Sequence, residues 1–584
     1  MRKVWHTVGI SFFSLLRRQW FLLSAVGIVL LPLIVFGHSL FQDFAAIDDS
    51  FLIVNNPIVH GWDIRRIWLA FTTFDPELYI PFTLVSFQLN WILANGAAWP
   101  FHATNLLLHS ANALLVTLLV LSLTRHKITA IVVGLLFAVH PLHTEAVVWA
   151  AGRKDLLCTT FLLLSYLLFR HWKIQGRSTA LIASIVFFLC SLLSKVLSAT
   201  LPAVLVIDLL LLDRHQRSKK KWWSLAPFML LSIGLLIVAR FGKEHILASS
   251  TLWETFVMAQ KSSMFYLQKL LVPLGLTVIY PFQETISLQR AEFLLPTLCN
   301  IVLLIAAFWQ RHKRPLVTFG ILFYFLTLSP TFFNFHKGDL LFFAVDRYAY
   351  IPSIGIFLAA TVLIGAVIKT WALPRNVAAV AACCVLSLLS VLSFRQTYVW
   401  DSPDTLFGRS VRLYPQSVAA RMALASVLRE RNDLTGAFDI LKEGLRYSDH
   451  PGLNLEAGLV YMASGQTEDA REQFEAARMK EPSIATSYFY LGFLDDYDKK
   501  TDNAIAHYTK AVALDPSYVS ARVSLARHLI RRKQFADARS QLLQALTWNP
   551  VSTETLSALT ELAHAQGRKD EATQWQQTLE WVSR

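Results

Sequence analysis

Nearly all of the long apolar runs of this 584-residue chain lie in residues 1–395, and this uneven distribution limits the possible folds. The first run extends from about Trp20 to Leu40, which is long enough for a helix to cross a bilayer. Only 16% of the residues are charged, whereas soluble domains contain about 25%. Residues 1–395 therefore predict a polytopic helical membrane domain, and the remaining residues predict a soluble helical one.

The N-terminus resembles a secretion signal in that basic residues precede an apolar run. Arg2, Lys3, Arg17 and Arg18 come before the first run. The run is too long for a signal peptide, and no cleavage site of small residues follows it. We therefore expect a retained membrane anchor whose N-terminus lies in the cytoplasm.

The formal net charge of +14 is concentrated in short connectors between apolar runs. In a protein with many spans, this pattern indicates cytoplasmic loops. Nucleic-acid binding is a weaker interpretation, because membrane spans separate the basic clusters. The clusters are Arg17-Arg18, Arg125-His126-Lys127, Arg170-His171-Trp172-Lys173, Lys219-Lys220-Lys221 and Arg311-His312-Lys313-Arg314.

Length and charge together predict about eleven spans, with every basic cluster on the cytoplasmic side. The short amphipathic stretch Pro81–Leu93 is then expected to lie on the outer surface rather than to cross. This topology puts the tail from Arg395 onward outside. The predicted spans are Trp20–Leu40, His102–Thr124, Ile128–Pro141, Leu156–Arg170, Ala180–Leu193, Val196–Leu212, Trp223–Phe241, Phe293–Gln310, Leu316–Thr331, Ala349–Val367 and Val377–Phe394.

The tail repeats itself with a period of 34 residues. Small residues and prolines fall on this period, which is typical of tetratricopeptide (TPR) repeats, where small residues let paired helices pack closely. The repeated positions are Ala470, Ala504, Ala538 and Ala572, and Pro482, Pro516 and Pro550. About five repeats cover Tyr414–Trp581. We predict a membrane domain over 1–395, a linker over 396–413 and an α-solenoid over 414–584.

A solenoid of this kind usually offers a concave groove to a peptide or protein. A scaffold for assembly is the alternative role. The five cysteines all lie in apolar stretches and offer neither metal-ligand spacing nor a disulfide framework.

Polar residues gather in four segments that the predicted topology puts on the outer side. The segments contain Asp48-Asp49, His140 to Asp155, Ser194-Lys195 and Asp346-Arg347-Tyr348. An acidic pair is best tolerated at the membrane edge, because an aspartate at the bilayer centre costs roughly 2.5–3.5 kcal/mol. Together these segments predict a site at the outer membrane surface.

A lipid-linked phosphate donor suits such a site. Arginine binds phosphate in a planar bidentate manner and lysine acts as a point charge. Transfer of a sugar from that donor also needs a carboxylate that takes the proton from an acceptor hydroxyl. The predicted phosphate contacts are Arg153, Lys154, Lys195 and Arg347, and Asp48 or Asp49 is the predicted base.

Other interpretations of these residues stay open. Arg153 to Asp155 could form a salt-bridged turn, Asp346 and Arg347 could pair with each other, and Lys195 could extend its ammonium to the interface without function. His140 and His143 have the spacing of metal ligands, but no third ligand is evident, so packing or substrate hydrogen bonds are favoured.

Several motifs in one order resemble the transmembrane and tetratricopeptide-repeat-containing O-mannosyltransferases and their bacterial relatives. The resemblance runs to about residue 355, and the repeats complete the same architecture. The motifs are Asp43-Phe44…Asp48-Asp49, Asn56-Pro57, Phe101-His102…Asn105-Leu106-Leu107-Leu108-His109, Phe137-Ala138-Val139-His140-Pro141…His143-Thr144-Glu145-Ala146-Val147, Gly152-Arg153…Asp155, Leu193-Ser194-Lys195 and Arg347-Tyr348…Tyr350-Ile351-Pro352-Ser353.

The resemblance implies an all-α GT-C glycosyltransferase fold and a polyprenyl- or dolichyl-phosphate-linked sugar donor. It also implies a protein hydroxyl as the acceptor. The family's acidic first-loop motif corresponds to Asp48 and Asp49, its second-loop acid to Glu145, and its arginine near the last spans to Arg347.

This chain departs from the family pattern at three places. It has Tyr79-Ile80-Pro81-Phe82 where the family usually has Tyr-Arg-Pro-Leu, so one cation is missing. It has Ser194-Lys195-Val196 in place of Ser-Lys-Glu, and Asp346-Arg347 in place of Glu-Arg. These departures leave the identity of the sugar open and favour a bacterial relative.

The sequence therefore predicts an inner-membrane glycosyltransferase that moves a sugar from a polyprenyl phosphate to Ser or Thr of an exported protein. Its active loops and TPR domain would lie in the periplasm or lumen, and the TPR groove would bind the acceptor. Asp155, Asp346, Tyr348, His140 and His143 are expected to contact substrate. No cofactor is predicted, although a divalent cation stays possible. The alternatives are a non-catalytic scaffold and an enzyme that glycosylates a lipid or glycan.

Overall fold

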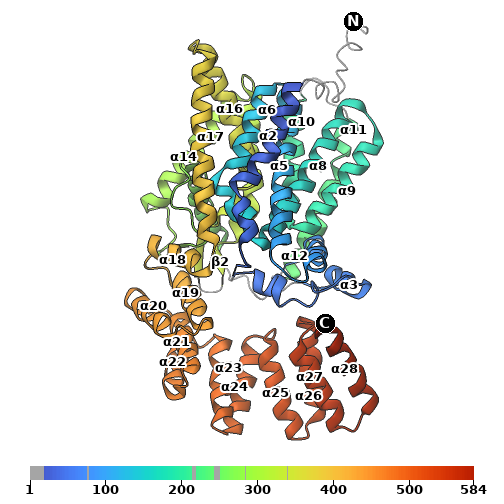
Figure 1. Ribbon diagram of the computed structural model, residues 1–584, viewed down its shortest axis with the longest axis vertical. Coiled ribbons are helices and arrows are strands. Elements are labelled where there is room, and N and C mark those ends of the chain that lie inside the picture. The colour runs from blue at the N-terminus through green and yellow to red at the C-terminus, as the bar shows by residue number, and fades with distance from the viewer. Residues whose placement is uncertain are drawn as a thin grey trace. The chain divides into compact units, whose positions relative to one another are not determined.

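A computed structural model of the chain (Figure 1) describes residues 19–45, 47–74, 78–213, 219–242, 250–282, 284–337 and 340–583. The chain divides into two compact units. The membrane unit holds the described residues up to Ser50 and those from Ala70 to Ser402. The repeat unit holds Phe51–Leu69 and the residues from Pro403 onward.

Long helices run side by side through the membrane unit (Figure 1). Each of the apolar stretches predicted as spans coincides with one of them. These helices are α2 (Gln19–Val35), α5 (Trp99–Thr124), α6 (Lys127–Val139), α8 (Arg153–Gln175), α9 (Ser178–Ser194), α10 (Leu201–Leu211), α12 (Ala226–Phe241), α14 (Ala291–Gln310), α15 (Pro315–Leu328), α16 (Ser353–Thr370) and α17 (Arg375–Thr397).

Among the described residues, six helical segments are long and apolar enough for a complete crossing. A seventh is obtained if Lys127–Val139 and Pro141–Val148, bent by 54° at their junction, form one broken span. Helices such as α10, with 11 residues, are shorter than the about 20 residues that a full span needs. The chain is thus an all-α protein with six to seven candidate membrane helices.

Further helices and turns connect these helices. The helices are α3 (Ile64–Thr72), α4 (Pro81–Ala94), α7 (Thr144–Val148), α11 (Lys219–Trp223) and α13 (Leu252–Leu271). The remaining turns are η1 (Gly37–Phe41), η2 (Ser50–Val54), η3 (Pro141–His143), η4 (Ala150–Gly152), η5 (Val196–Thr200), η6 (Ser329–Phe333), η7 (Asp346–Ala349) and η8 (Tyr398–Trp400).

A small antiparallel sheet joins two of the long loops. It has the order β1-β3-β2, made by Tyr280–Phe282, Leu340–Ala344 and His336–Lys337. Tyr280 pairs with Ala344 and Phe282 with Leu341. The sequence predicted only loops here, because strands of two to five residues are too short to display a two-residue alternation.

Helices α15 and α16 pack with little space between their backbones. A Cβ atom added to Gly320 would lie 2.3 Å from the carbonyl oxygen of Gly355, and the reverse is equally true. Small residues at such a crossing let membrane helices approach closely. The two glycines therefore fix where α15 and α16 cross.

The repeat unit contains five antiparallel helix pairs over the range predicted for the TPR array. One contact recurs within two of these pairs, between residues nineteen positions apart: the amide of Asn454 donates to Gln473 at 2.8 Å, and the guanidinium of Arg522 donates to Gln541 at 2.7 Å. The pairs are α19 (Val418–Glu430) with α20 (Leu434–Tyr447), α21 (Pro451–Ala463) with α22 (Thr467–Lys480), α23 (Ala485–Tyr497) with α24 (Thr501–Leu514), α25 (Val519–Arg531) with α26 (Phe535–Trp548), and α27 (Thr553–Ala565) with α28 (Lys569–Ser583).

The small residues that revealed the period have the predicted packing role. Ala470, Ala504 and Ala538 are completely buried. A Cβ atom on Gly458 would lie 2.4 Å from the ring of Phe474, so the glycine makes room for that ring. The helix pairs therefore depend on these positions.

Residues 396–413, predicted to be a linker, are mostly helical. Helix α17 continues to Thr397, η8 follows, and α18 (Pro403–Leu413) precedes the first repeat pair. The boundary between the two units falls directly before α18, at Ser402.

Candidate active site

The loop between α6 and α8 carries several of the predicted site residues, and polar side chains of α5 hold its backbone. His102 bonds through Nδ1 to the carbonyl of Val148 at 2.9 Å, and Asn105 donates to the carbonyl of Trp149 at 2.7 Å. A completely buried carbonyl needs such a partner. Helix α5 therefore fixes the backbone of this loop.

Gly152 ends the loop between α6 and α8, at a position where a side chain would not fit. A Cβ atom there would lie 2.5 Å from the carbonyl oxygen of Ala146. The glycine thus allows η4 to fold back against α7, immediately before Arg153 begins α8.

Asp49 fastens the loop after α2 to the loop after α7. One of its carboxylate oxygens accepts the N–H of Ala45 at 2.9 Å and the other accepts the N–H of Ala151 at 2.8 Å. The residue is completely buried. Burial raises the pKa of this carboxyl to about 7, against the opposing effect of the two N–H donors.

Asp48 has a different environment from its neighbour. Its carboxylate receives the ammonium of Lys154 at 2.8 Å, and its side chain stays 23% exposed. Of the acidic pair, Asp48 is therefore the carboxylate that solvent can reach.

Lys195 lies between α9 and η5 and pairs with Asp155. Its ammonium is 2.6 Å from the carboxylate, and its carbonyl accepts the thiol of Cys158 at 3.3 Å. Burial lowers the pKa of Lys195 to about 8, although Asp155 opposes this shift. The second oxygen of Asp155, Oδ2, is buried and has no hydrogen-bond partner among the described residues.

Arg347 forms a two-point contact with Glu145. Its backbone N–H donates to one carboxylate oxygen at 2.9 Å, and its guanidinium bonds the other. Burial lowers the pKa of Arg347, but Glu145 together with Tyr348, Asp48 and Asp155 outweighs this effect, and the net direction is upward. The Nε atom of Arg347 is buried without a partner among the described residues.

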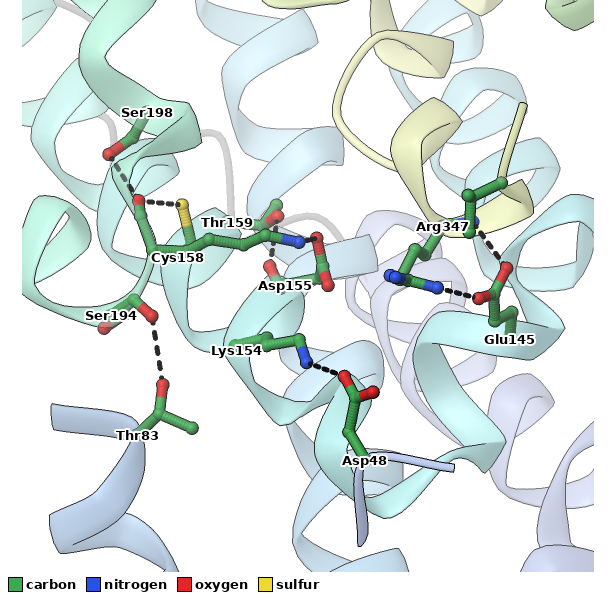
Figure 2. A network of polar contacts seen from close by, with 12 residues as sticks. Asp48, Thr83, Glu145, Lys154, Asp155, Cys158, Thr159, Ser194, Ser198 and Arg347 are labelled. Atoms are coloured by element: carbon green, nitrogen blue, oxygen red, sulfur yellow. Dashed lines mark hydrogen bonds and ion pairs between the residues drawn. The ribbon is translucent and has the colours of Figure 1, made fainter. Parts of the chain in front are cut away.

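Figure 2 shows the three ion pairs close together, and two aromatic rings contact their cations. We call Asp48, Glu145, Lys154, Asp155, Lys195 and Arg347 the ion-pair cluster. The ring of Trp149 lies 4.5 Å from the ammonium of Lys154 and 4.9 Å from the guanidinium of Arg347. The ring of Tyr348 lies 5.3 Å from that guanidinium and 5.5 Å from the ammonium of Lys195. Four segments distant in sequence thus meet at one place.

Arg153 has other partners than the ion-pair cluster. Its guanidinium donates to the side chains of Asn105 at 2.5 Å and Asn90 at 2.8 Å, and to the carbonyl of Phe101 at 2.8 Å. It is completely buried. This arrangement attaches the start of α8 to α4 and α5.

His140 and His143 point into packed surroundings with their nitrogens bonded. His140 contacts the carbonyl of Leu270 at 3.1 Å, and His143 bridges the carbonyl of Phe137 at 2.8 Å and the hydroxyl of Ser353 at 3.0 Å. Within the described residues, no group of three or more histidine, cysteine or acidic side chains could hold a metal ion.

Asp346 lies next to Arg347 but accepts the hydroxyl of Tyr280 at 2.7 Å. Burial and the nearby Glu145 carboxylate raise the pKa of Asp346 well above its usual range. Tyr266 fixes the same turn, because its hydroxyl donates to the carbonyl of Val345 at 3.0 Å. Strand β1 and helix α13 therefore hold Arg347 in position.

The supporting residues of α5 were not predicted as part of the site. His102, Asn105, His109 and Asn112 recur at helical spacing on an otherwise apolar helix, and this recurrence was the available signal. His109 bonds the hydroxyl of Tyr350 at 2.7 Å, and Asn112 donates to the carbonyl of Leu156 at 3.0 Å.

Two family models match the repeat unit. Both describe the tetratricopeptide repeat, one over residues 455–492 and the other over residues 497–562. The prediction of TPR repeats is thereby confirmed over these residues.

The chain also resembles curated protein O-mannosyl-transferases. Human protein O-mannosyl-transferase TMTC4 is 26% identical over 69% of this chain and 64% of its own length, and human TMTC1 is 27% identical over 68% and 52%. Caenorhabditis elegans protein O-mannosyl-transferase F38B6.6 is 25% identical over 70% and 60%. The chain thus spans about half to two thirds of the length of these relatives, and it is a homologue of the TPR-containing protein O-mannosyltransferases.

Two of the matching solved structures each cover about a third of this chain. Pseudomonas aeruginosa pilF is 18% identical with a TM-score of 0.28, covering 32% of this chain and 82% of that chain. The TPR protein YrrB is 16% identical with a TM-score of 0.25, covering 30% of this chain and 91% of that chain.

Proposed function

We propose that this protein is a membrane glycosyltransferase that moves a sugar from a polyprenyl-phosphate-linked donor to a Ser or Thr hydroxyl of an exported protein. The observation that carries the proposal is the convergence of three ion pairs on Trp149 and Tyr348. Homology to protein O-mannosyltransferases supports it.

Lys154, Lys195 and Arg347 are the proposed contacts of the donor phosphate. Each is neutralised by one carboxylate, so the cluster carries little net charge before the donor arrives. Phosphate oxygens would compete with these carboxylates for the cations. The unpartnered Nε of Arg347 offers a further donor that no carboxylate occupies.

Asp48 is the proposed general base. Its carboxylate takes the proton of the acceptor hydroxyl, whose oxygen forms a bond to the anomeric carbon. The bond from that carbon to the phosphate oxygen breaks, and its electron pair leaves with the phosphate. Attack opposite to the leaving phosphate inverts the configuration, and the cations stabilise the departing charge.

Asp49, Glu145 and Arg153 are proposed to position the reacting groups. Asp49 fixes the loop that presents Asp48, Glu145 aims Arg347, and Arg153 anchors the start of α8 that carries Lys154. A phosphate contact by Arg153 would require it to leave at least three hydrogen bonds. His140, His143, Asp155, Asp346 and Tyr348 would then shape or line the site.

The proposed topology puts the ion-pair cluster and the repeats on the periplasmic or luminal side of a bacterial inner membrane or its equivalent. The TPR groove would bind the acceptor. A compartment reporter fused after Arg584 tests the orientation, and a cytoplasmic signal would overturn it.

The test of the chemistry is glycosylation of acceptor protein in membranes containing the Asp48→Asn or Asp49→Asn variant at equal expression. We expect Asp48→Asn to lower the rate by about a hundredfold or more, the usual contribution of a general base. Mass spectrometry of exported proteins identifies the product. Undiminished transfer by both variants would reject the catalytic assignment and favour a scaffold.

A further inference from the structure

The first loop of the chain contributes a segment to the repeat unit. We call Phe51–Leu69 the arm, and it belongs to the same compact unit as the TPR helices. Asp63 begins the helix of the arm by accepting the N–H of Arg66 at 2.9 Å. Leu52, Ile53 and Val59 of the arm are buried.

Arg66 joins the arm to the last helix of the repeats, α28. It is 6% exposed, and its guanidinium donates to the carbonyls of Trp581 at 3.0 Å and Pro57 at 3.1 Å while pairing with Asp63 at 2.5 Å. Its charge and donors are therefore already used within the arm and α28.

The neighbouring Arg65 is arranged differently. Its guanidinium lies 4.0 Å from the centre of the Trp581 ring, and within the described residues it forms no ion pair. Stacking on an indole restricts a guanidinium while leaving its N–H edge available. Arg65 thus presents an uncompensated and oriented positive charge.

That charge lines a recess between the arm and α28. The cavity has a volume of about 350 Å³ and is lined by Arg65, Gln574, Trp575, Gln577 and Thr578. This volume is at the small end of the range of ligand pockets, roughly 300–1,000 Å³. It suits one or two amino-acid residues, and the glutamine amides offer both donors and acceptors.

We propose that this recess binds a carboxylate of a polypeptide. One oriented guanidinium matches the planar, singly charged carboxylate in a bidentate manner. A membrane surface with anionic lipids is recognised by clusters of four to eight cations, whereas the lining of this recess contains one. The proposal does not depend on glycosyl transfer.

The carboxylate could belong to an acidic side chain or to a chain terminus. The probes are therefore acetyl-Gly-Gly-Glu-Gly-Gly-amide and a pentaglycine with a free C-terminus. Their uncharged counterparts carry Gln in place of Glu or a C-terminal amide. Binding to the purified full chain in detergent micelles is followed by ligand-detected NMR.

We expect at least one charged probe to bind about tenfold or more tightly than its uncharged counterpart, the effect of a charged hydrogen bond. The probe that binds identifies the source of the carboxylate. Arg65→Gln should remove this preference. Arg65→Lys should keep only part of it, because a lysine ammonium lacks the two parallel N–H donors of a guanidinium. Arg531→Gln, an equal change at an exposed arginine of α25, should leave binding unchanged.

Three results would overturn the proposal. They are equal binding of charged and uncharged probes, unchanged binding by Arg65→Gln, and displacement of the bound probe by inorganic phosphate at a lower concentration than by acetate. Arg65 is exposed, so we expect its variants to keep the melting temperature of the parent chain.

Discussion

At the scale of single residues, adjacent positions of like type have different environments. Asp48 is partly exposed and ion-paired, whereas Asp49 is buried and bonded to two backbone N–H groups. Arg65 and Arg66 also differ in burial, but there the buried residue, Arg66, is the one that forms an ion pair. The sequence identified Asp48-Asp49 as a pair but could not divide the roles, because burial depends on loops that meet only in the folded chain.

The raised pKa of Asp49 has a consequence for stability. Its carboxyl titrates at about 7 in the folded chain and near 3.8 in the unfolded chain. The folded state therefore favours the protonated form, so the contribution of Asp49 to stability is highest below pH 3.8 and is lost as the pH rises through 7. The full change is as much as about 4 kcal/mol. We expect the melting temperature to fall from pH 5 to pH 8 more in the parent chain than in Asp49→Asn, and equal slopes would contradict this.

The proposed contact of Lys195 with the donor phosphate predicts how donor binding depends on pH. Its pKa of about 8 means that the ammonium is charged below pH 8 and neutral above it. The KM for the lipid-phosphate donor should therefore rise between pH 7 and pH 9, while the KM for the acceptor should change little. Arg stays charged throughout this range, so Lys195→Arg should remove the dependence. A dependence that persists in Lys195→Arg would assign the titration to another group.

At the scale of elements, most helices could be predicted from the sequence and most contacts between them could not. Apolar runs set the positions of the long helices, and the 34-residue period set the repeats. The partner of Lys195 is Asp155, forty positions away, and no local pattern encodes such a pairing. The short strand Tyr280–Phe282 was missed for the same reason, since its partner lies beyond residue 340.

Helices α8 and α10 share a buried ionic network that the positive-inside pattern did not predict. Asp208 is completely buried and contacts Arg170 at 3.0 Å and Lys173 at 2.9 Å. Removing one partner of a buried pair leaves an uncompensated charge, at a cost of about 3–5 kcal/mol. We expect Asp208→Asn to lower the melting temperature strongly. Asp213→Asn, in a less buried pair with Lys221, should have a small effect, and equal effects would contradict the prediction.

The crossing of α15 and α16 makes a second prediction at this scale. Gly320→Ala would put a Cβ atom 2.3 Å from the carbonyl of Gly355, so the helices must separate. We expect lower stability by about 1–3 kcal/mol, the usual cost of overpacking. Gly365→Ala on α16 is the matched control, because nothing lies within 4 Å of its Cβ position. Equal thermal stability of the two variants would show that the crossing tolerates the extra atom.

At the scale of the whole molecule, the two units are connected by three passages of the chain. They lie after Ser50, after Leu69 and after Ser402. From the sequence, the repeat pattern predicted only the connection near Ser402. The arm has no 34-residue periodicity, so the pattern did not assign it to the repeat unit. The arm begins two positions after Asp49, so the loop that carries the acidic pair leads directly into the repeat unit.

We expect the loss of the Trp581 side chain to loosen the arm from α28. Its ring contacts the guanidinium of Arg65 at 4.0 Å and that of Arg66 at 4.5 Å. Such contacts contribute roughly 0.5–2 kcal/mol each, so their removal should open the arm locally without unfolding the repeats. We expect trypsin to cut Trp581→Ala after Arg65 or Arg66 at least tenfold faster than the parent chain, with mass spectrometry locating the cut.

Tyr497→Ala, at an aromatic residue of α23 that is 70% exposed, should leave the rate unchanged. Because Asp63 and the backbone carbonyl at position 581 still hold Arg66 in the variant, continued resistance to trypsin would mean that the arm holds its fold without the Trp581 ring.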